Sequence, residues 1–296
     1  MIRFLFAVLV ALTLLAGAFA PANAAEPKKL LLMAGTPSHG PGEHEFNAGV
    51  QLLAKCLESV DGLEVIVQLN GWPEDDAKFD GVDGILLYMD GGDRHPAVQP
   101  GRLQFLGKLM DQGVGLMCAH YGVEVPAENG GAEFKKWIGG YYETAFSCNP
   151  MWEPDYQNFP AHPIAQGVKP FQIRDEWYMN MRFRDDMTGV TEMLVAKPSD
   201  EVRDGPYVYP KGPYEHIQAE KGEPETMMWA VERSDGGRGV GFTGGHFHKN
   251  WGNDNFRTAV LNALVWITGM DVPEGGVQST VTEEDLTKNL DPKEKR

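Results

Sequence analysis

The stretch VDGILLYMDGGD, residues 82–93, decides the fold. Its first eight residues are mostly apolar, and the Asp-Gly-Gly-Asp at 90–93 that follows is typical of a turn. A short apolar run of this kind is typical of a central parallel strand, because such a strand is buried on both faces. The sequence therefore predicts a buried strand over 82–89, followed by a loop.

Strands and helices alternate on both sides of this stretch. Short apolar runs predict the strands, and apolar residues three or four apart predict the helices. The further strands are expected at 29–34, 63–69, 114–118, 226–233 and 239–243, and the helices at 46–57, 100–111 and 255–268. Over the first ~120 residues this alternation predicts βαβ units, and hence an α/β fold with a doubly wound, mostly parallel sheet.

The other segments are less regular. Residues 123–175 are rich in aromatics, Gly and Pro without a clean period, and 200–225 form a polar excursion that is expected to be a β-hairpin or an insertion. The charged tail, 271–296, allows one short helix at 281–290, and its last residues are expected to be disordered. The chain is thus divided into a leader at 1–24, a domain at 25–270 and the tail.

The leader has the order of a secretory signal peptide. Arg3 supplies the positive charge, an apolar run follows over 4–15, and small residues at 22–24 form an A-x-A site, which predicts cleavage after Ala24. The alternative is a membrane anchor, but the run falls short of the ~20 residues that span a bilayer. No later segment approaches that length, so no membrane insertion is expected. The sequence predicts export to the periplasm or the medium.

The net charge and the cysteine content of the chain limit its possible binding partners and its disulfides. The formal net charge is −16 at pH 7, which argues against nucleic acid and anionic membranes, since both are polyanions. Three cysteines, Cys56, Cys118 and Cys148, permit one disulfide at most, and free buried thiols are expected at the first two. The oligomeric state is left open.

Histidines gather where ligands bind in an open parallel sheet, at the carboxyl ends of the strands. Six of the eight follow predicted strands: His39, His44, His95, His120, His246 and His248. The run Cys-Ala-His-Tyr-Gly at 118–122 has the small-x-X-x-small form of a nucleophile elbow, with His120 at the strained centre. A histidine there suits a ligand or general base better than an acyl nucleophile. A hydrolase that uses Cys118 is the rival interpretation.

Several short motifs occur in a fixed order around these histidines. They are Gly-Glu-His-Glu at 42–45, His120, His-Pro at 162–163 leading to Gly-Val at 167–168, Asp-Glu-Trp-Tyr at 175–178, Trp-Ala-Val-Glu-Arg at 229–233, Gly-Arg at 237–238 leading to Gly-Gly-His at 244–246, and Trp266. In this order, over about residues 29–269, they resemble the ThuA-like (trehalose utilisation) domain of the class I glutamine amidotransferase-like superfamily. The resemblance implies a flavodoxin-like three-layer sandwich and a link to disaccharide and keto-sugar metabolism. It does not imply glutaminase activity, since His120 replaces the triad cysteine.

A doubly wound sheet would bring His44, His120 and His246 together from three loops. Three imidazoles suit a divalent metal such as zinc and leave a fourth position open. Glu176 is expected to act as a general base or a ligand, and Asp175 to orient a histidine. Hydrogen-bonding loop residues are the simpler alternative for each histidine. Further single expectations are His39 and His248 as spare ligands, a structural turn at 162–163, and surface positions for His95 and His216.

Two functions follow from this site. The first is an exported carbohydrate-active enzyme that acts on a glycoside or keto-sugar by metal-assisted or acid–base chemistry. The second is a non-catalytic sugar-binding module. In either, aromatic rings would meet the C–H faces of a sugar, with ordinary core packing as the alternative. The side chains expected to contact the sugar are Asp90, Tyr121, Trp177 and Tyr178, with Trp152 and Trp251 as further aromatic candidates.

Overall fold

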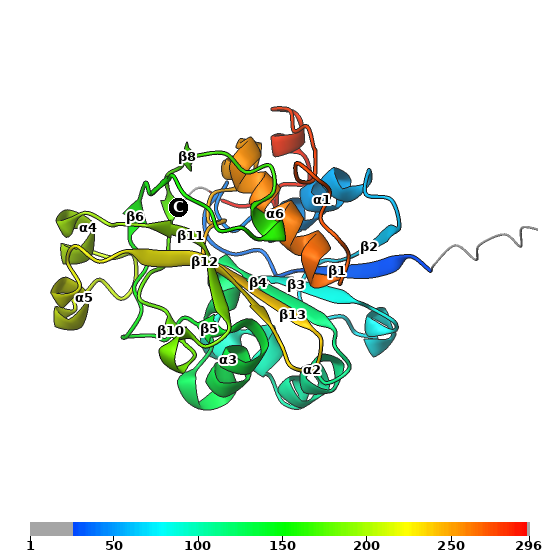
Figure 1. Cartoon of the computed structure of the whole chain (residues 1–296), viewed down its shortest axis with the longest axis horizontal. Coiled ribbons are helices and arrows are strands. Elements are labelled where there is room, and N and C mark those ends of the chain that lie inside the picture. Colours follow the sequence, from blue (N-terminus) through cyan, green and yellow to red (C-terminus); the bar gives the residue numbers. More distant parts are fainter. Residues whose placement is uncertain (1–25, 295–296) are drawn as a thin grey trace, which may run out of the picture.

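A seven-stranded sheet forms the centre of the structure, a computed structural model that describes residues 26–294 (Figure 1). In sheet order its strands are β11 (Val190–Ala196), β12 (Glu225–Glu232), β13 (Arg238–Phe242), β4 (Gly115–Ala119), β3 (Gly84–Tyr88), β1 (Lys28–Ala34) and β2 (Leu63–Gln68). The run β2-β1-β3-β4-β13 is parallel, whereas β12 and then β11 each pair antiparallel with their neighbour. This is the flavodoxin-like strand order with an antiparallel extension at one edge.

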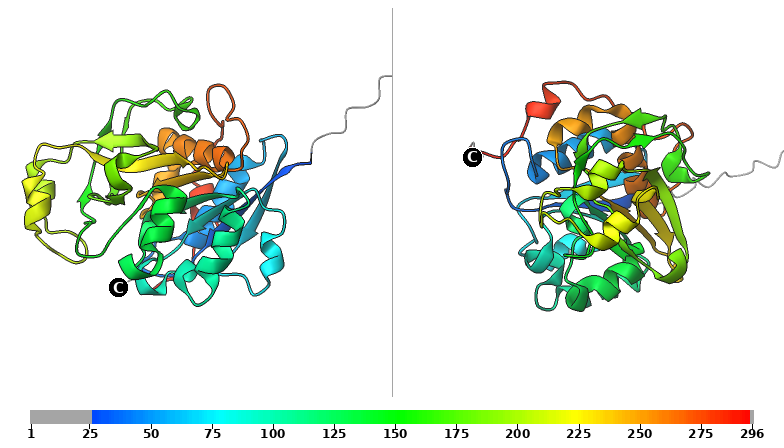
Figure 2. Two further views of the ribbon diagram at one scale, coloured as in Figure 1. Left: turned by 60° about the horizontal axis from the view of Figure 1, so that its bottom comes forward. Right: turned by 90° about the vertical axis from the view of Figure 1, so that its left-hand side faces the viewer.

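Helices cover both faces of the sheet, as the alternation in the sequence predicts. The helices α1 (Phe46–Leu57) and α6 (Asp254–Ile267) lie on one face, and α2 (Arg102–Met110) and α3 (Ala132–Ile138) lie on the other (Figures 1 and 2). Two separate clusters of buried apolar residues fill the spaces between these layers. The predicted α/β three-layer sandwich is confirmed, and the elements that were expected end within a few residues of their predicted bounds. The sequence predicted neither α3 nor β11.

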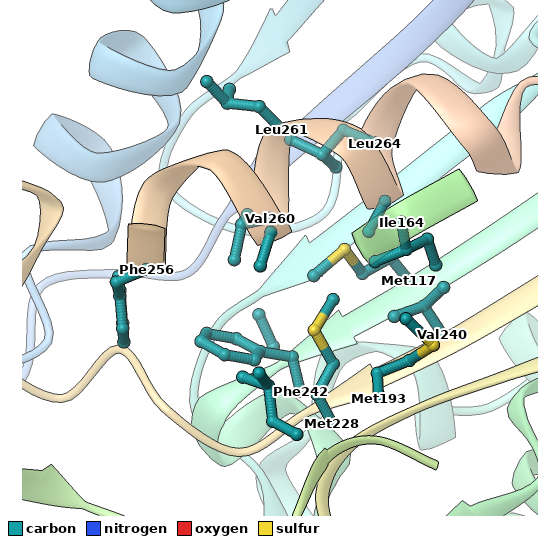
Figure 3. Packing of buried hydrophobic residues seen from close by; sticks show 14 of the residues in the cluster. Met117, Ile164, Met193, Met228, Val240, Phe242, Phe256, Val260, Leu261 and Leu264 are labelled. Atoms are coloured by element: carbon teal, nitrogen blue, oxygen red, sulfur yellow. The ribbon is translucent and has the colours of Figure 1, made fainter. Parts of the chain in front are cut away.

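The core beneath α6 fixes the carboxyl half of the sheet. Val260 and Leu264 of α6 pack with Met117 of β4 and with Val240 and Phe242 of β13 (Figure 3). All five side chains are fully buried, and burying a side chain of this size stabilises the fold by about 1.5–3 kcal/mol. The loops that follow β4 and β13 therefore start from a rigid base.

Short ladders make up the segment without a clean period. These two-residue strands are β5 (Gly140–Tyr141), β6 (Met151–Trp152), β7 (Asp155–Tyr156), β8 (Phe171–Gln172), β9 (Asp175–Glu176) and β10 (Arg182–Phe183). They pair antiparallel as β10 with β5, β6 with β9, and β7 with β8. The β6–β9 ladder positions Asp175 and Glu176, which pair with Trp152 and Met151.

The polar excursion at 200–225 is an insertion, and the β-hairpin expected as its other form is absent. It consists of two short helices, α4 (Asp200–Asp204) and α5 (Glu215–Ala219), joined by a loop. Ser199 caps α4 by accepting a hydrogen bond from the Val202 amide. Three prolines in the connecting loop lack the N–H groups that a hairpin ladder needs. The pair of helices projects beyond one end of the sheet (Figure 1).

The charged tail is more ordered than expected. A 3-10 helix over Asp285–Thr287 lies inside the range predicted for a short helix. Beyond it, the side chain of Lys293 is only 5% exposed and pairs with the buried Glu45. The expectation of disorder is therefore wrong for this residue, because ion pairing holds it against the domain.

The structure confirms two smaller expectations, the free cysteines and the turn at 162–163. All three cysteines are free and buried. His162 begins a structural turn, since its ring accepts a hydrogen bond from the Ile164 amide. Over residues 26–294 no helix is long and apolar enough to cross a membrane. The signal peptide predicted at 1–24 lies outside the described residues.

Candidate metal centre

Three histidines and one glutamate converge at the carboxyl edge of the parallel strands. His44, His120 and His246 come from the loops after β1, β4 and β13, and Glu176 ends β9. One ligand atom from each lies within 4.8 Å of all the others, and all four residues are buried. A buried cluster of this composition, named here the His–Glu cluster, could hold a metal ion.

The hydrogen bonds of His44 and His120 aim two lone pairs at each other. His120 donates through Nδ1 to the Thr243 carbonyl oxygen at 3.0 Å, and His44 donates through Nδ1 to Asp90 Oδ1 at 2.9 Å. In a neutral imidazole the other nitrogen is then an acceptor. These two Nε2 atoms lie 3.0 Å apart. Two acceptors at this distance repel unless a cation lies between them.

A shared proton is a poor cation for this place. Burial lowers the pKa of His120, and the charges that His44 and His246 would carry lower it further. Burial likewise lowers the pKa of His44, with His39 and His246 adding to the shift. Both rings are therefore neutral at pH 7, which is the form that binds metals.

His246 and Glu176 complete the cluster. His246 Nδ1 lies 2.7 Å from Glu176 Oε2 and 3.0 Å from His44 Nε2. Burial by itself would lower the pKa of His246, but the hydrogen bond and charge of Glu176 outweigh it and raise that pKa. Within the described residues, His246 Nε2 is buried and has no hydrogen-bond partner. Because Glu176 is buried within reach of all three histidines, it is a fourth candidate ligand.

The backbone at two of these histidines is strained. His44 has φ = 45° and His120 has φ = 51°, in a left-handed region that residues with a Cβ seldom occupy. The small-x-His-x-small pattern predicts this strain at His120. Gly122 is needed beside it, because a Cβ there would lie 2.7 Å from the Leu87 carbonyl oxygen.

Asp175 positions His246 through the backbone and not through the ring. Its carboxylate accepts hydrogen bonds from the amides of Gly245 and His246, at 2.9 and 3.1 Å, and from the Asn250 side chain at 3.0 Å. Asp175 is itself completely buried. It therefore fixes the turn that aims His246 at the cluster.

A cavity of about 740 Å³ opens beside the cluster and is lined by His44, Glu176, Tyr121 and Tyr178, among others. The Tyr178 hydroxyl lies 3.4 Å from His120 Nε2. Both tyrosines predicted to contact a ligand are therefore on the cavity wall. The third aromatic, Trp177, is placed in the core, where it packs against Phe242 and Phe256.

Asp90 and the two remaining tryptophan candidates lie off this cavity wall. Asp90 accepts the hydrogen bond from His44 Nδ1, and it lines a neighbouring cavity together with Tyr121. Trp152 and Trp251 are buried in the core. Aromatic residues of these segments thus serve packing more than ligand contact.

The remaining histidines described in the sequence lie outside the His–Glu cluster. His39 stacks on His44 with ring centres 3.5 Å apart and lines the cavity. His248 is buried apart from the cluster, and burial lowers its pKa to about 4. His216 is exposed, as predicted. His95 was expected at the surface but is completely buried, because the Gly122 carbonyl and the Ala97 amide satisfy both ring nitrogens.

Cys118 is unsuited to nucleophilic chemistry. Its side chain is completely buried in the core on the α2–α3 face. Burial raises its pKa far above that of a free thiol, and the thiolate is the reactive form. The structure therefore speaks against the rival cysteine hydrolase.

Three residues of the site carry no signal in the sequence. Asn149 donates to Glu176 Oε1 at 2.8 Å, and Glu124 and Tyr209 line the cavity. Burial raises the pKa of Glu124 to about 7, and the charge of Glu176 contributes to this shift. Asn149 and Glu124 belong to the segment without periodicity, where only the folded structure shows which side chains face the site.

Known proteins share this fold. A family model described as trehalose utilisation (ThuA) matches residues 29–267. The crystal structure of a ThuA-like protein from Bacteroides uniformis is similar with a TM-score of 0.56 and 16% identity, covering 85% of this chain and 96% of that one. A ThuA-like protein from Parabacteroides merdae gives 0.55 and 15%, covering 88% and 99%. Identities this low show the fold alone. Among curated proteins there is no match.

Proposed function

The chain belongs to the ThuA (trehalose utilisation) family, and on that premise we propose that it is an exported enzyme acting on a glycoside or keto-sugar. The reaction takes place in the cavity beside the His–Glu cluster, which binds one divalent metal ion, with zinc as the first candidate. The observation that carries the proposal is the pair of Nε2 lone pairs of His44 and His120, 3.0 Å apart and buried.

The residues divide the work between them. His44, His120, His246 and Glu176 hold the cation, while Asp90 and Asp175 fix two of these histidines from behind. When bound there, a divalent cation supplies a Lewis acid that polarises a carbonyl or hydroxyl oxygen of the sugar.

Proton transfer needs a second group in the cavity. Because Glu176 would help to hold the cation, it is less available as a general base than its position in the sequence suggested. Glu124 lines the same cavity with a pKa of about 7, and a group with a pKa near the working pH is the best general acid or base. We assign it the proton transfer to or from the sugar oxygen.

The metal part is tested by titration of the purified chain. After treatment with a chelator, the wild type should bind one zinc or manganese ion per chain in isothermal titration calorimetry. His120→Ala should weaken that affinity at least 100-fold, because it removes a buried ligand. His216→Ala changes an exposed histidine and is the matched control. Wild-type affinity in His120→Ala would contradict the proposed centre.

The same variant separates an enzyme from a binding module. On a panel of glycosides and keto-glycosides, an enzyme loses turnover in His120→Ala. If the wild type binds sugars but converts none of the compounds in the panel, the chain is a sugar-binding module.

Export is tested on the chain produced in its own cell type. N-terminal sequencing should give a protein that starts at Ala25, outside the cytoplasm. A chain that keeps Met1 inside the cell contradicts this part of the proposal.

A further inference from the structure

An exposed aromatic ring stands on the wall of the cavity. Large apolar side chains are seldom exposed in the described part of the chain: only Val208, Tyr209 and Leu290 are, at 39%, 74% and 40%. Val208 and Tyr209 are adjacent, and both line the cavity beside the His–Glu cluster. An exposed apolar surface at the wall of a polar cavity is a feature of a binding site.

The loop that carries this ring is held by Asn149, which also contacts Glu176 of the His–Glu cluster. Asn149 accepts hydrogen bonds from the Val208 amide through its carbonyl oxygen, at 3.2 Å, and from the Tyr209 amide through Oδ1, at 3.1 Å. The same side chain donates through Nδ2 to Glu176 Oε1. Asn149 thus fixes the position of the exposed ring relative to the His–Glu cluster.

Hydrogen bonds of Tyr207 also hold the loop. Tyr207 is only 2% exposed, and its hydroxyl donates to the Arg203 carbonyl oxygen at 2.6 Å. Its amide donates across the loop to Lys211. The ring of Tyr209 is therefore presented by an ordered loop, which lowers the entropic cost of stacking a ligand on it.

The cavity between the ring and the cluster suits a polyhydroxylated ligand. Its volume of about 740 Å³ lies within the range of sites for ligands as large as a disaccharide. Polar side chains that can accept hydrogen bonds from hydroxyl groups line the same cavity, including Asp93, Glu124, Glu143 and Thr144.

We propose that Tyr209 forms an outer sugar subsite, stacking on the second ring of a disaccharide whose first ring lies against the His–Glu cluster. The phenol ring offers its face to the C–H groups of the sugar, and Asn149 sets its distance from the centre. This inference rests on the proposed function for the nature of the ligand. It adds that Tyr209, on the wall of the cavity, is the residue that contacts the second ring.

The test compares one-ring and two-ring ligands on the mature, metal-loaded chain. Calorimetric titration with trehalose, sucrose and cellobiose is set against titration with methyl glucosides. Tyr209→Ala should raise the disaccharide Kd about tenfold, the effect of losing one stacked ring. It should leave the Kd of the methyl glucosides unchanged. Tyr209→Phe keeps the ring and should bind like the wild type, as should Leu290→Ala, which removes an exposed apolar side chain away from the cavity.

Other outcomes overturn the subsite. They are an unchanged disaccharide Kd in Tyr209→Ala, equal losses for one-ring and two-ring ligands, or a wild type that binds none of these sugars. The zinc titration of the same samples reports on the centre separately. Sugar binding that depends on Tyr209 without any metal binding would contradict the metal centre and leave the subsite standing.

Discussion

His44 and His120 combine backbone strain with complete burial. Each occupies the left-handed region, at a cost of about 1 kcal/mol or more. Each also removes a polar ring from water. Such costs persist where the surrounding structure over-determines the geometry, as Asp90 and the Thr243 carbonyl do here. Backbone strain of this kind clusters at functional sites, which supports the role proposed for these two side chains.

Glu124 should make stability depend on pH. Burial raises its pKa to about 7 in the folded chain, above its ordinary value of about 4.3 in the unfolded one. The folded state therefore holds the proton more tightly, so its stabilising contribution is present below pH 4 and is lost as the pH rises through 7. Because the cavity admits solvent, the loss is about 1–2 kcal/mol.

Glu124→Gln removes this titration and keeps an acceptor for the Thr144 hydroxyl. Urea unfolding at pH 5 and pH 7.5 should therefore show a smaller fall in free energy for this variant than for the wild type. Glu128→Gln, which alters an exposed carboxylate on the same cavity, should behave as the wild type. Identical pH profiles for the wild type and Glu124→Gln would refute the burial of a protonated Glu124.

Single residues of the site were predictable to different degrees. His44, His120 and His246 follow strands and also belong to motifs of the ThuA resemblance, and the two signals together predicted the trio. Position after a strand was not enough by itself, since His95 and His248 also follow strands and lie outside the cluster. Trp177 illustrates the limit: it is next to Glu176 in the sequence, but alternation along the chain turns it into the core. Nothing in the sequence showed which neighbour faces the cavity.

At the scale of elements, the elbow after β4 depends on close approach to β3. A Cβ at Gly122 would lie 2.7 Å from the Leu87 carbonyl oxygen. Gly122→Ala should therefore lower the unfolding free energy by about 2 kcal/mol, because backbone must move to admit the methyl group. It should also weaken zinc binding, since the shift displaces His120. Thermal or urea unfolding, together with the zinc titration, measures both effects.

Gly107→Ala is the matched control for this substitution. Gly107 lies inside α2, and a Cβ there would meet only Trp137 at an ordinary 3.7 Å. Alanine is the better helix former, so this variant should gain about 0.5–1 kcal/mol. Equal stabilities for the two variants would mean that the elbow tolerates a wider gap from β3 than its geometry implies.

The elements themselves were predictable where a period runs long enough to be read. Most strands and helices of the sandwich show a period of 3.6 residues or a continuous apolar run, and these were predicted. The edge strand β11 and the short helix α3 were not predicted. The ladders β5 to β10 are two residues each, too short for any period, and they form because tertiary contacts align them. In the loop between α4 and α5, the prolines resemble the turn signals of a hairpin, whereas in the structure they exclude its ladder.

On the scale of the whole molecule, the tail closes on the first loop of the sheet. Lys293 donates from Nζ to the His44 carbonyl oxygen at 3.1 Å and to that of Glu43, and it pairs with Glu45 Oε1 at 3.3 Å. The Asp291 amide donates to Glu45 Oε2 at 2.9 Å. Residues nearly 250 positions apart thus hold the strained turn of His44.

This contact predicts that the tail tunes the centre. In Lys293→Met, and in a chain ended at Leu290, the turn at His44 loses its outer support, so the zinc Kd should rise about tenfold, as it does when residues that position a ligand are removed. The sheet and its two apolar clusters are untouched, so the melting temperature of the metal-free protein should fall by only a few degrees. Lys288→Met alters an exposed lysine that pairs only within the tail and is the control. Wild-type zinc affinity in the shortened chain would show that β1 and Asp90 position His44 without the tail.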